Sequence, residues 1–457
     1  MYIKKFKILF FAVLLLSGIT GCFTNDPYPS HIKFKNNEAL LSPTQQQTIL
    51  QQVDSMLNRS YINQTEITSK LSKLKNINTD SAFLATDLAQ KITLTLREAF
   101  NDKHLALYYD TALVNRLTYE QRKGNNWNDI KFYEAYIEHE DLIKSHNFDF
   151  EKVEILSGNI AYLKFNYFAK LSNAQPTIDA AMQFVSNADA LIIDLQENAG
   201  GHVLTAEYIS GLFYPENTTL FYRTLNDETE MEYFAKGEGP KSLWNIPLYV
   251  LISERTASAA EIITNTFMET KRAKVIGSLT WGGAHACSFI ILNDAFVLLL
   301  PLSKVGGPVS KTNWEAKGIK PDITKAPENI IDNAHHLAVS DLLDKTINTK
   351  AKRKYKGILK TIEAKFNKAL PKLSDYTGTY GNHQIIEERN ALFYNKEGNR
   401  AVALIPIKDD EFILQNSNFE TVFFSRTKKG KVYAANFIKS KGDTLSYLIN
   451  ENDFGEK

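Results

Sequence analysis

Ser258 is placed where a serine hydroxyl could act as a nucleophile. The apolar run at 246–252 predicts a buried strand, and the segment from 259 onward carries apolar residues at helical spacing. Ser258 should therefore lie at a strand-to-helix turn, beside the first N–H groups of the helix. These groups lack internal partners and carry a partial positive charge, so they can stabilise an oxyanion. Thr256 or Ser258 could instead serve only as the N-cap of this helix.

Gly200 and Gly201 lie in a second turn of the same kind. The turn follows 188–195, an apolar stretch typical of a strand covered on both faces, and precedes a helical pattern at 203–213. Adjacent glycines leave backbone N–H groups open to a substrate, although a glycine pair can also be a plain turn. Serine chemistry needs a nucleophile, a base, a group that orients the base and donors for the oxyanion. The two turns could supply the first and the last.

Two successive strand–turn–helix units favour an α/β core with a partly parallel sheet, which we place at 158–345. Ahead of the core, 41–157 is interpreted as an N-terminal helical region, with an amphipathic helix at 80–100. The lysine-rich linker at 346–372 is expected to be solvated, as a helix or an extended segment. Short aromatic and β-branched segments across 373–457 predict a small C-terminal antiparallel β domain.

Residues 1–22 predict a lipoprotein signal peptide that is not part of the fold. Basic residues precede an apolar run, and the sequence ITGC ending at Cys22 resembles a bacterial lipobox, with cleavage before Cys22 and lipid on its thiol. An ordinary signal peptide with an incidental cysteine is the alternative. The polar residues 23–40 are interpreted as a tether. We therefore expect a location in the bacterial cell envelope, periplasmic or at the outer membrane, with membrane attachment through the lipid.

The composition is that of an ordinary globular protein. The chain has 457 residues, of which 44% are hydrophobic and 23% charged, and its net charge of +1 argues against nucleic acid as the main partner. Lipidation of Cys22 would leave Cys287 as the one remaining cysteine, so no disulfide is expected. The sequence shows neither a metal-ligand cluster nor a phosphate loop, so neither a metal nor a cofactor is expected.

Four stretches resemble, in order, the tail-specific (C-terminal processing) serine protease family: ALIIDLQENAGG, ISERTASAAEI, VIGSLTWGGAH and TNWEAKGIKPD. Several ordered motifs at family-like separations are more specific than any one alone. The similarity covers roughly 80–325 and is greatest to the tricorn-core and interphotoreceptor-retinoid-binding-protein-like branch. It implies a core folded like crotonase and the caseinolytic protease. By this resemblance Ser258 takes the place of the nucleophile, and the N–H group of Ala259, with that of Gly200 or Gly201, takes the oxyanion hole.

The resemblance also implies where the base comes from. Gly283 stands where the Ser-Lys members carry their lysine base, so that lysine is missing here. The tricorn-like branch uses a histidine from an earlier segment, which His104 resembles. Glu315 matches the acidic residue that this branch places near the catalytic group, where it could assist through a hydrogen-bond relay. His104 could instead be an ordinary buried histidine, and Glu315 could only organise a turn.

Other residues compete for the role of the base or could line the cleft. His285 follows Gly282 and Gly283 closely, and His202 follows the earlier glycine pair, so either imidazole could face the substrate. Lys304 is a further candidate base.

The predicted function is that of an envelope-anchored serine endopeptidase, which hydrolyses polypeptides through an acyl-enzyme. The alternative is a catalytically inactive lipoprotein that binds a ligand or peptide on the same scaffold. The stretch 111–157 is polar, with little periodicity and no PDZ-like pattern, so capture of substrate C-termini by a PDZ domain is not expected. The sequence does not determine the oligomeric state.

Overall fold

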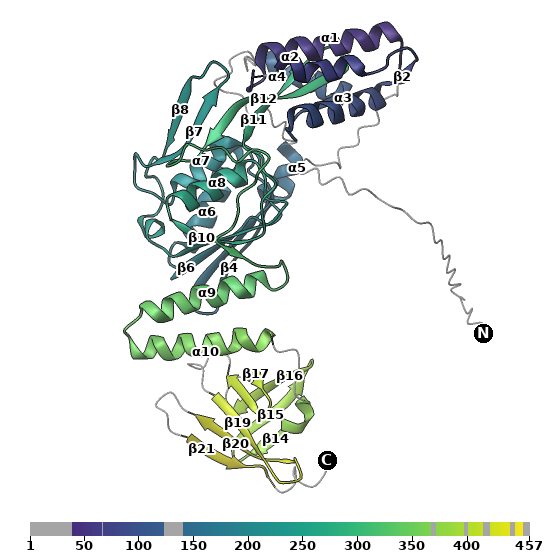
Figure 1. Cartoon of the computed structure of the whole chain (residues 1–457). Coiled ribbons are helices and arrows are strands. Elements are labelled where there is room, and N and C mark those ends of the chain that lie inside the picture. The colour runs from purple at the N-terminus through teal and green to yellow at the C-terminus, as the bar shows by residue number, and fades with distance from the viewer. Residues whose placement is uncertain are drawn as a thin grey trace, which may run out of the picture. The chain divides into compact units, whose positions relative to one another are not determined.

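The computed structural model describes residues 39–65, 67–122, 140–366, 372–396, 401–414, 421–438 and 444–450 (Figure 1). The predicted signal peptide, the lipidation site Cys22 and nearly all of the tether at 23–40 lie outside these residues. The described part begins in a helical layer, continues into a mixed α/β core, and ends in an antiparallel β domain.

The N-terminal layer is built from amphipathic helices. The main ones are α1 (Pro43–Ser60), α2 (Ile67–Leu71) and α3 (Ala85–Phe100), and a short ribbon of β1 (Leu40–Leu41) and β2 (Phe83–Leu84) joins α1 to α3. The helix predicted at 80–100 is α3, which buries Leu88, Ile92 and Leu96 on one face. It ends at Asn101, whose left-handed backbone (φ 50°) turns the chain toward His104.

The core contains a six-stranded sheet that is parallel except at one edge. In spatial order its strands are β13 (Ile323–Thr324), β10 (Ala273–Gly277), β9 (Leu248–Ile252), β6 (Ala190–Asp194), β5 (Ile160–Phe165) and β4 (Phe150–Leu156). Only the β4–β5 pair is antiparallel. The expected α/β core with a partly parallel sheet is therefore confirmed.

Helices cover both faces of this sheet. On one face α6 (Leu171–Val185), α7 (Val203–Gly211) and α8 (Ala259–Glu269) pack against alternate strand residues such as Leu191 and Ile193. On the other, α9 (Ile330–Lys345) and α10 (Thr349–Phe366) pack against the intervening residues, such as Ile192 and Tyr249. Burial on both faces explains why β6 and β9 have almost no polar residues.

The lysine-rich run is not simply a solvated linker. Its first part forms α10, which buries Tyr355, Ile358 and Ile362 in the core while Lys352, Lys354 and Lys356 remain exposed. The sequence reading missed this amphipathic spacing because the dense positive charge dominated the segment. Likewise, 111–122 form a helix, α4 (Thr111–Arg122), where the sequence showed little periodicity.

A second, five-stranded sheet carries part of the site. Its strands are β11 (His285–Ile291), β12 (Phe296–Gly306), β7 (Thr219–Leu225), β8 (Glu230–Phe234) and β3 (Ala106–Tyr109), which pairs with β12. The long strand β12 thus lies between β11 on one side and, on the other, β3 at one end and β7 at the other. Through these pairings β3 and β11 bring the segments around His104 and His285 to the same region.

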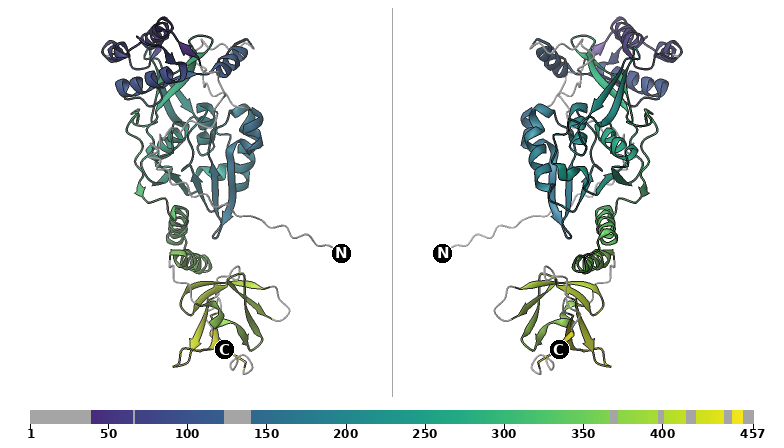
Figure 2. Two further views of the ribbon diagram at one scale, coloured as in Figure 1. Left: turned by 90° about the vertical axis from the view of Figure 1, so that its right-hand side faces the viewer. Right: turned by 90° about the vertical axis from the view of Figure 1, so that its left-hand side faces the viewer.

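The C-terminal domain is an eight-stranded antiparallel meander, as predicted for this part of the chain. Its strands are β14 (Gly378–Tyr380), β15 (His383–Glu388), β16 (Ala391–Lys396), β17 (Val402–Lys408), β18 (Glu411–Leu414), β19 (Thr421–Arg426), β20 (Val432–Ile438) and β21 (Thr444–Leu448). A bridge between Tyr380 and Ile449 joins the first strand to the end of the last. The curved sheet in Figure 2 is therefore barrel-like, with an interior filled by aromatic and aliphatic side chains.

Within the described residues, we find no helix with the length and apolar character needed to cross a bilayer.

Candidate active site

Ser258 lies at the turn between β9 and α8, as its sequence context predicted. Its backbone has φ 52° and ψ −119°, an unusual conformation for a residue with a side chain. Such strained residues often occur at functional sites, at a cost of about 1–3 kcal/mol each. The surrounding contacts hold the conformation: the Ser258 N–H donates to Glu261 Oε2 at 2.9 Å, and its carbonyl accepts the N–H of Ile262 at 3.1 Å.

The Gly200 turn packs directly on the Ser258 turn. A β-carbon on Gly200 would lie 2.7 Å from Ser258 Cβ and 3.0 Å from Ala259 N, and φ at Gly200 is +102°. A side chain at Gly200 would therefore crowd both the serine and the first helical N–H. Gly201 is needed for a different contact, because its β-carbon would lie 2.3 Å from the carbonyl oxygen of Phe168.

The two glycines differ in whether the backbone N–H group is already hydrogen-bonded. The Gly200 N–H donates to Asn198 Oδ1 at 2.9 Å, so in this conformation it is not free for an oxyanion. Among the residues that the structure describes, no acceptor is found for the N–H groups of Gly201 and Ala259. Of the predicted oxyanion donors, Ala259 and Gly201 remain the available pair.

Glu261 is a buried residue of this site that the sequence reading missed. Its Oε2 accepts the N–H groups of Ser258 (2.9 Å) and Gly283 (2.7 Å), and its Oε1 accepts the N–H of Gly282 (2.9 Å) and the Thr280 hydroxyl. Burial raises the pKa of Glu261 to about 7, although these four donors favour the ionised form. The carboxylate therefore ties the serine turn to the glycine turn. The serine-to-glutamate spacing of three, that of a capping box, was the available signal.

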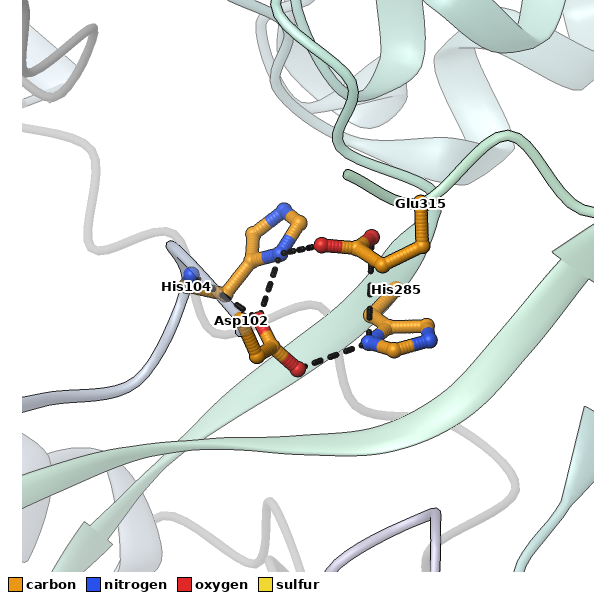
Figure 3. Close-up of side chains that lie close together, drawn as sticks. All are labelled: Asp102, His104, His285 and Glu315. Atoms are coloured by element: carbon orange, nitrogen blue, oxygen red, sulfur yellow. Dashed lines mark hydrogen bonds and ion pairs between the residues drawn. The ribbon is translucent and has the colours of Figure 1, made fainter. Parts of the chain in front are cut away.

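His104 is fully buried beside that glycine turn. Its ring meets Trp281 edge-to-face, with centroids 5.1 Å apart. Its Nδ1 faces two carboxylates, with Asp102 Oδ1 at 3.2 Å and Glu315 Oε1 at 3.5 Å (Figure 3). Because Nδ1–H points at these acceptors, Nε2 is the atom left to accept a proton. In the described part of the chain Nε2 has no hydrogen-bond partner, so the Ser258–His104 hydrogen bond of an assembled triad is not formed here.

Asp102 and His285 complete the group around His104. Asp102 Oδ1 also accepts the His104 backbone N–H at 3.0 Å, whereas Oδ2 lies 2.8 Å from His285 Nδ1 and accepts the Tyr61 hydroxyl at 3.0 Å (Figure 3). Asp102 belongs to the stretch that indicated His104, but no role was predicted for it. Its carboxylate joins the two imidazoles.

Glu315 reaches the same group from a turn after β12. Its N–H donates to Asn313 Oδ1 at 2.8 Å, and its Oε2 accepts the Ala284 N–H at 2.6 Å. The Asn313 contact organises a turn, which was the alternative role expected for Glu315. That turn also directs the Glu315 carboxylate toward His104 and His285.

The contacts within this group shift the pKa values of Asp102 and His104. Burial would raise the pKa of Asp102, but its hydrogen bonds to His104 and His285 hold that pKa below its usual range. Burial would lower the pKa of His104, but the Glu315 and Asp102 carboxylates hold it above its usual range. The group therefore has a strong affinity for positive charge.

The remaining candidates lie outside the group. His202 is the buried N-cap residue of α7, and its N–H donates to the Phe168 carbonyl at 2.8 Å. Lys304 lies opposite His285 in the β11–β12 ladder, and within the described residues no hydrogen bond or ion pair joins its amine to Ser258.

Comparison with known proteins addresses the part of the chain that carries Ser258, Glu261 and Glu315. Residues 159–325 match the model of peptidase family S41. The resemblance to C-terminal processing proteases is thus confirmed for this segment. The matched segment contains both turns, His285 and Glu315, whereas Asp102 and His104 precede it.

Two curated relatives that match this chain are carboxyl-terminal-processing enzymes by name. The carboxyl-terminal-processing peptidase 1 of Arabidopsis thaliana is 26% identical over 177 residues, which cover 39% of this chain and 36% of that protein. The carboxyl-terminal-processing protease of Synechocystis is 29% identical over 167 residues, which cover 36% of this chain and 37% of that protein. This chain therefore spans less than two fifths of the length of these relatives. Among solved structures, the photosystem II D1 C-terminal processing protease matches with a TM-score of 0.42 at 14% identity, covering 62% of this chain and 93% of that one.

Proposed function

We propose that this chain is a serine endopeptidase that hydrolyses peptide bonds through an acyl-enzyme. One observation carries the proposal: a strained Ser258 at a helix N-terminus packs against Gly200, and Glu261 joins it to the glycine turn where His104 Nε2 lies. The nucleophile, the oxyanion donors, the base and the glycine turn bound by Glu261 thus come from four separated segments. A turn that served only as a helix cap would not need the other three.

In the proposed acylation step, Ser258 Oγ attacks the peptide carbonyl carbon while His104 Nε2 takes the hydroxyl proton. The N–H groups of Ala259 and Gly201 stabilise the oxyanion. His104 then gives the proton to the leaving amine as the C–N bond breaks. Water repeats the sequence on the ester, which releases the acid and restores the serine.

Asp102 and Glu315 orient the base in this mechanism. In the neutral imidazole Asp102 Oδ1 accepts from Nδ1–H at 3.2 Å and Glu315 Oε1 lies 3.5 Å from the same nitrogen, which favours the tautomer with Nε2 free to accept a proton. The carboxylates also stabilise the imidazolium that forms during attack. Since Nε2 and Oγ are not hydrogen-bonded in this structure, substrate binding must bring them to roughly 2.6–3.2 Å, as happens in many enzymes whose catalytic contacts tighten with substrate.

Two further parts of the proposal concern fold and location. We assign the core to the fold of crotonase and the caseinolytic protease, which the parallel strands β5, β6, β9 and β10 with helices on both faces support. We also propose cleavage before Cys22, a lipid on its thiol and attachment to the cell envelope. Loss of membrane association in Cys22→Ala would support this attachment, and unchanged association would contradict it.

Covalent labelling by a fluorophosphonate tests the chemistry. We expect wild type to be labelled and to hydrolyse unfolded casein, and Ser258→Ala to lose both. The matched control is Ser278→Ala, because Ser278 follows β10 and its hydroxyl donates a hydrogen bond to Glu254, away from the proposed catalytic group. Absence of labelling in wild type, or persistence of labelling in Ser258→Ala, would favour an inactive binding protein on this scaffold.

A further inference from the structure

Four side chains of the site present metal-ligand atoms to one another. These are Nδ1 of His104 and His285 and carboxylate oxygens of Asp102 and Glu315, all within 4.8 Å of one another (Figure 3). Nitrogen and oxygen donors alternate around the group, so that each imidazole has a carboxylate on either side. The residues come from three separate segments, and the group forms only in the folded chain.

The spacings between these nitrogen and oxygen atoms are similar to those of ligands around one metal ion. The Nδ1–oxygen distances are 3.2 and 3.5 Å for His104, and 2.8 and 3.7 Å for His285. The 2.8 and 3.2 Å distances to Asp102 are within hydrogen-bonding range, whereas the 3.5 and 3.7 Å distances to Glu315 are longer. Four ligands placed at about 2.0–2.1 Å around a tetrahedral zinc are separated by roughly 3.3–3.4 Å. The distances between 2.8 and 3.7 Å scatter around that edge length, and because each imidazole faces a different oxygen of each carboxylate, one oxygen of each carboxylate would serve as the ligand.

Charge and unmet hydrogen bonding point the same way. Asp102 and Glu315 are only 1% and 11% exposed, so two carboxylates share this buried group with two imidazoles. Glu315 Oε1 is buried and has no hydrogen-bond partner among the described residues, although it faces His104 Nδ1. Buried charges in proteins are normally paired or coordinate a metal. One divalent cation would balance both carboxylates and use the unpaired oxygen.

We propose that Asp102, His104, His285 and Glu315 form a tetrahedral site for a first-row divalent cation, for which Zn²⁺ fits best. Imidazole nitrogens favour zinc over magnesium and calcium, which prefer oxygen ligands and higher coordination numbers. All four positions are filled by the protein, so the ion has no open position for a water or substrate. The site is therefore inhibitory or structural and takes no part in hydrolysis.

The regulatory consequence rests on the proposed peptidase function. A metal bound to Nδ1 of His104 requires that the proton of the neutral imidazole lie on Nε2. Nε2 can then no longer accept a proton from Ser258, so the base is blocked while the ion is bound. Zinc would hold the peptidase inactive until a competing chelator or a change in metal concentration removed it.

The test is a calorimetric titration of the chelator-treated full chain, in detergent, with zinc chloride. We expect one zinc per chain in wild type and also in Ser258→Ala, which lacks the nucleophile but keeps all four ligands. His285→Gln and Glu315→Gln should each weaken binding at least tenfold. His336→Gln is the matched control, because His336 is a surface histidine paired with Glu363, and its affinity should equal that of wild type. Thermal unfolding of each variant identifies any that fails to fold.

A second readout is independent of hydrolysis. Cobalt chloride should give the intense visible absorption of a tetrahedral centre in Ser258→Ala, and both ligand variants should lose it. Absence of stoichiometric binding in wild type, or equal affinity in folded His285→Gln and Glu315→Gln, would overturn the site. Zinc binding without fluorophosphonate labelling after metal removal would refute the peptidase function alone. Labelling and casein hydrolysis that zinc leaves unchanged at saturation would refute the inhibition.

Discussion

His104 occupies the space that a side chain at Gly283 would need. Its Nε2 lies 2.9 Å from the point where a β-carbon on Gly283 would stand, closer than ordinary van der Waals contact. Trp281 closes the other side of that point, with a ring carbon at 2.6 Å. The absence of a side chain at Gly283 therefore leaves room for the His104 imidazole, which we propose as the base.

Gly283→Ala should accordingly displace His104. We expect a large loss of kcat and only a moderate loss in the free energy of unfolding. We expect kcat on unfolded casein to fall on the order of a hundredfold, with a loss of about 1–3 kcal/mol in the free energy of unfolding, because the methyl group must displace two packed rings. Gly211→Ala in α7 is the control, since its β-carbon would meet no atom closer than 3.4 Å. Unchanged kcat in Gly283→Ala would show that His104 is not the base.

Asp102→Asn tests the orientation of the two imidazoles. Its amide can offer an N–H where His104 now finds an acceptor, which favours the tautomer with the proton on Nε2. We expect kcat to fall roughly a hundred- to ten-thousandfold with little change in KM. Tyr61→Phe is the comparison, because it removes only the hydroxyl that donates to Asp102 and leaves both imidazoles paired. Equal losses in the two variants would assign Asp102 a merely structural role.

The sequence identifies those residues of the site that lie in a turn directly after an apolar strand. Ser258 and Gly200 each follow an apolar strand, and their placement beside one another follows from the parallel order β6–β9. The group around His104 is different, because Asp102 and His285 are separated by 183 positions and meet only through pairing of β3 and β11 with β12. No local spacing encodes that contact, and His104 itself could be indicated only by family resemblance.

Two details could not be decided from the sequence. The Asn198 side chain accepts the Gly200 N–H, and nothing in a glycine pair indicates which of its N–H groups is already bonded. In α10 the apolar residues Tyr355, Ile358 and Ile362 follow helical spacing, but neighbouring lysines obscured the buried face. In both cases the backbone pattern was visible in the sequence, but the deciding contact was not. Asn198 lies only two residues from Gly200, whereas α10 packs against core strands that are distant in the chain.

The raised pKa of Glu261 should make the free energy of unfolding depend on pH. Its pKa is raised to about 7 in the folded protein from the usual 4.5, so the folded chain binds this proton more tightly than the unfolded chain. The contribution to stability is full below about pH 4.5 and is lost as pH rises through about 7, by at most about 3 kcal/mol. Glu261→Gln cannot titrate there. The free energy of unfolding of wild type, relative to this variant, should therefore fall from pH 5 to pH 8 in urea titrations. A constant difference would contradict a raised pKa.

The packing of α10 sets where the chain can be shortened. A chain that ends after Phe366 keeps the whole helix, whereas one that ends after Lys350 loses Tyr355, Ile358 and Ile362 from the core around β5, β6 and β9. Each buried side chain of this size contributes about 1.5–3 kcal/mol, so the shorter chain should lose on the order of 5 kcal/mol or more. We expect the longer chain to unfold cooperatively and to label with fluorophosphonate, and the shorter one to aggregate or melt well below it. Equal melting temperatures would mean that the helix belongs with the β domain and not with the peptidase core.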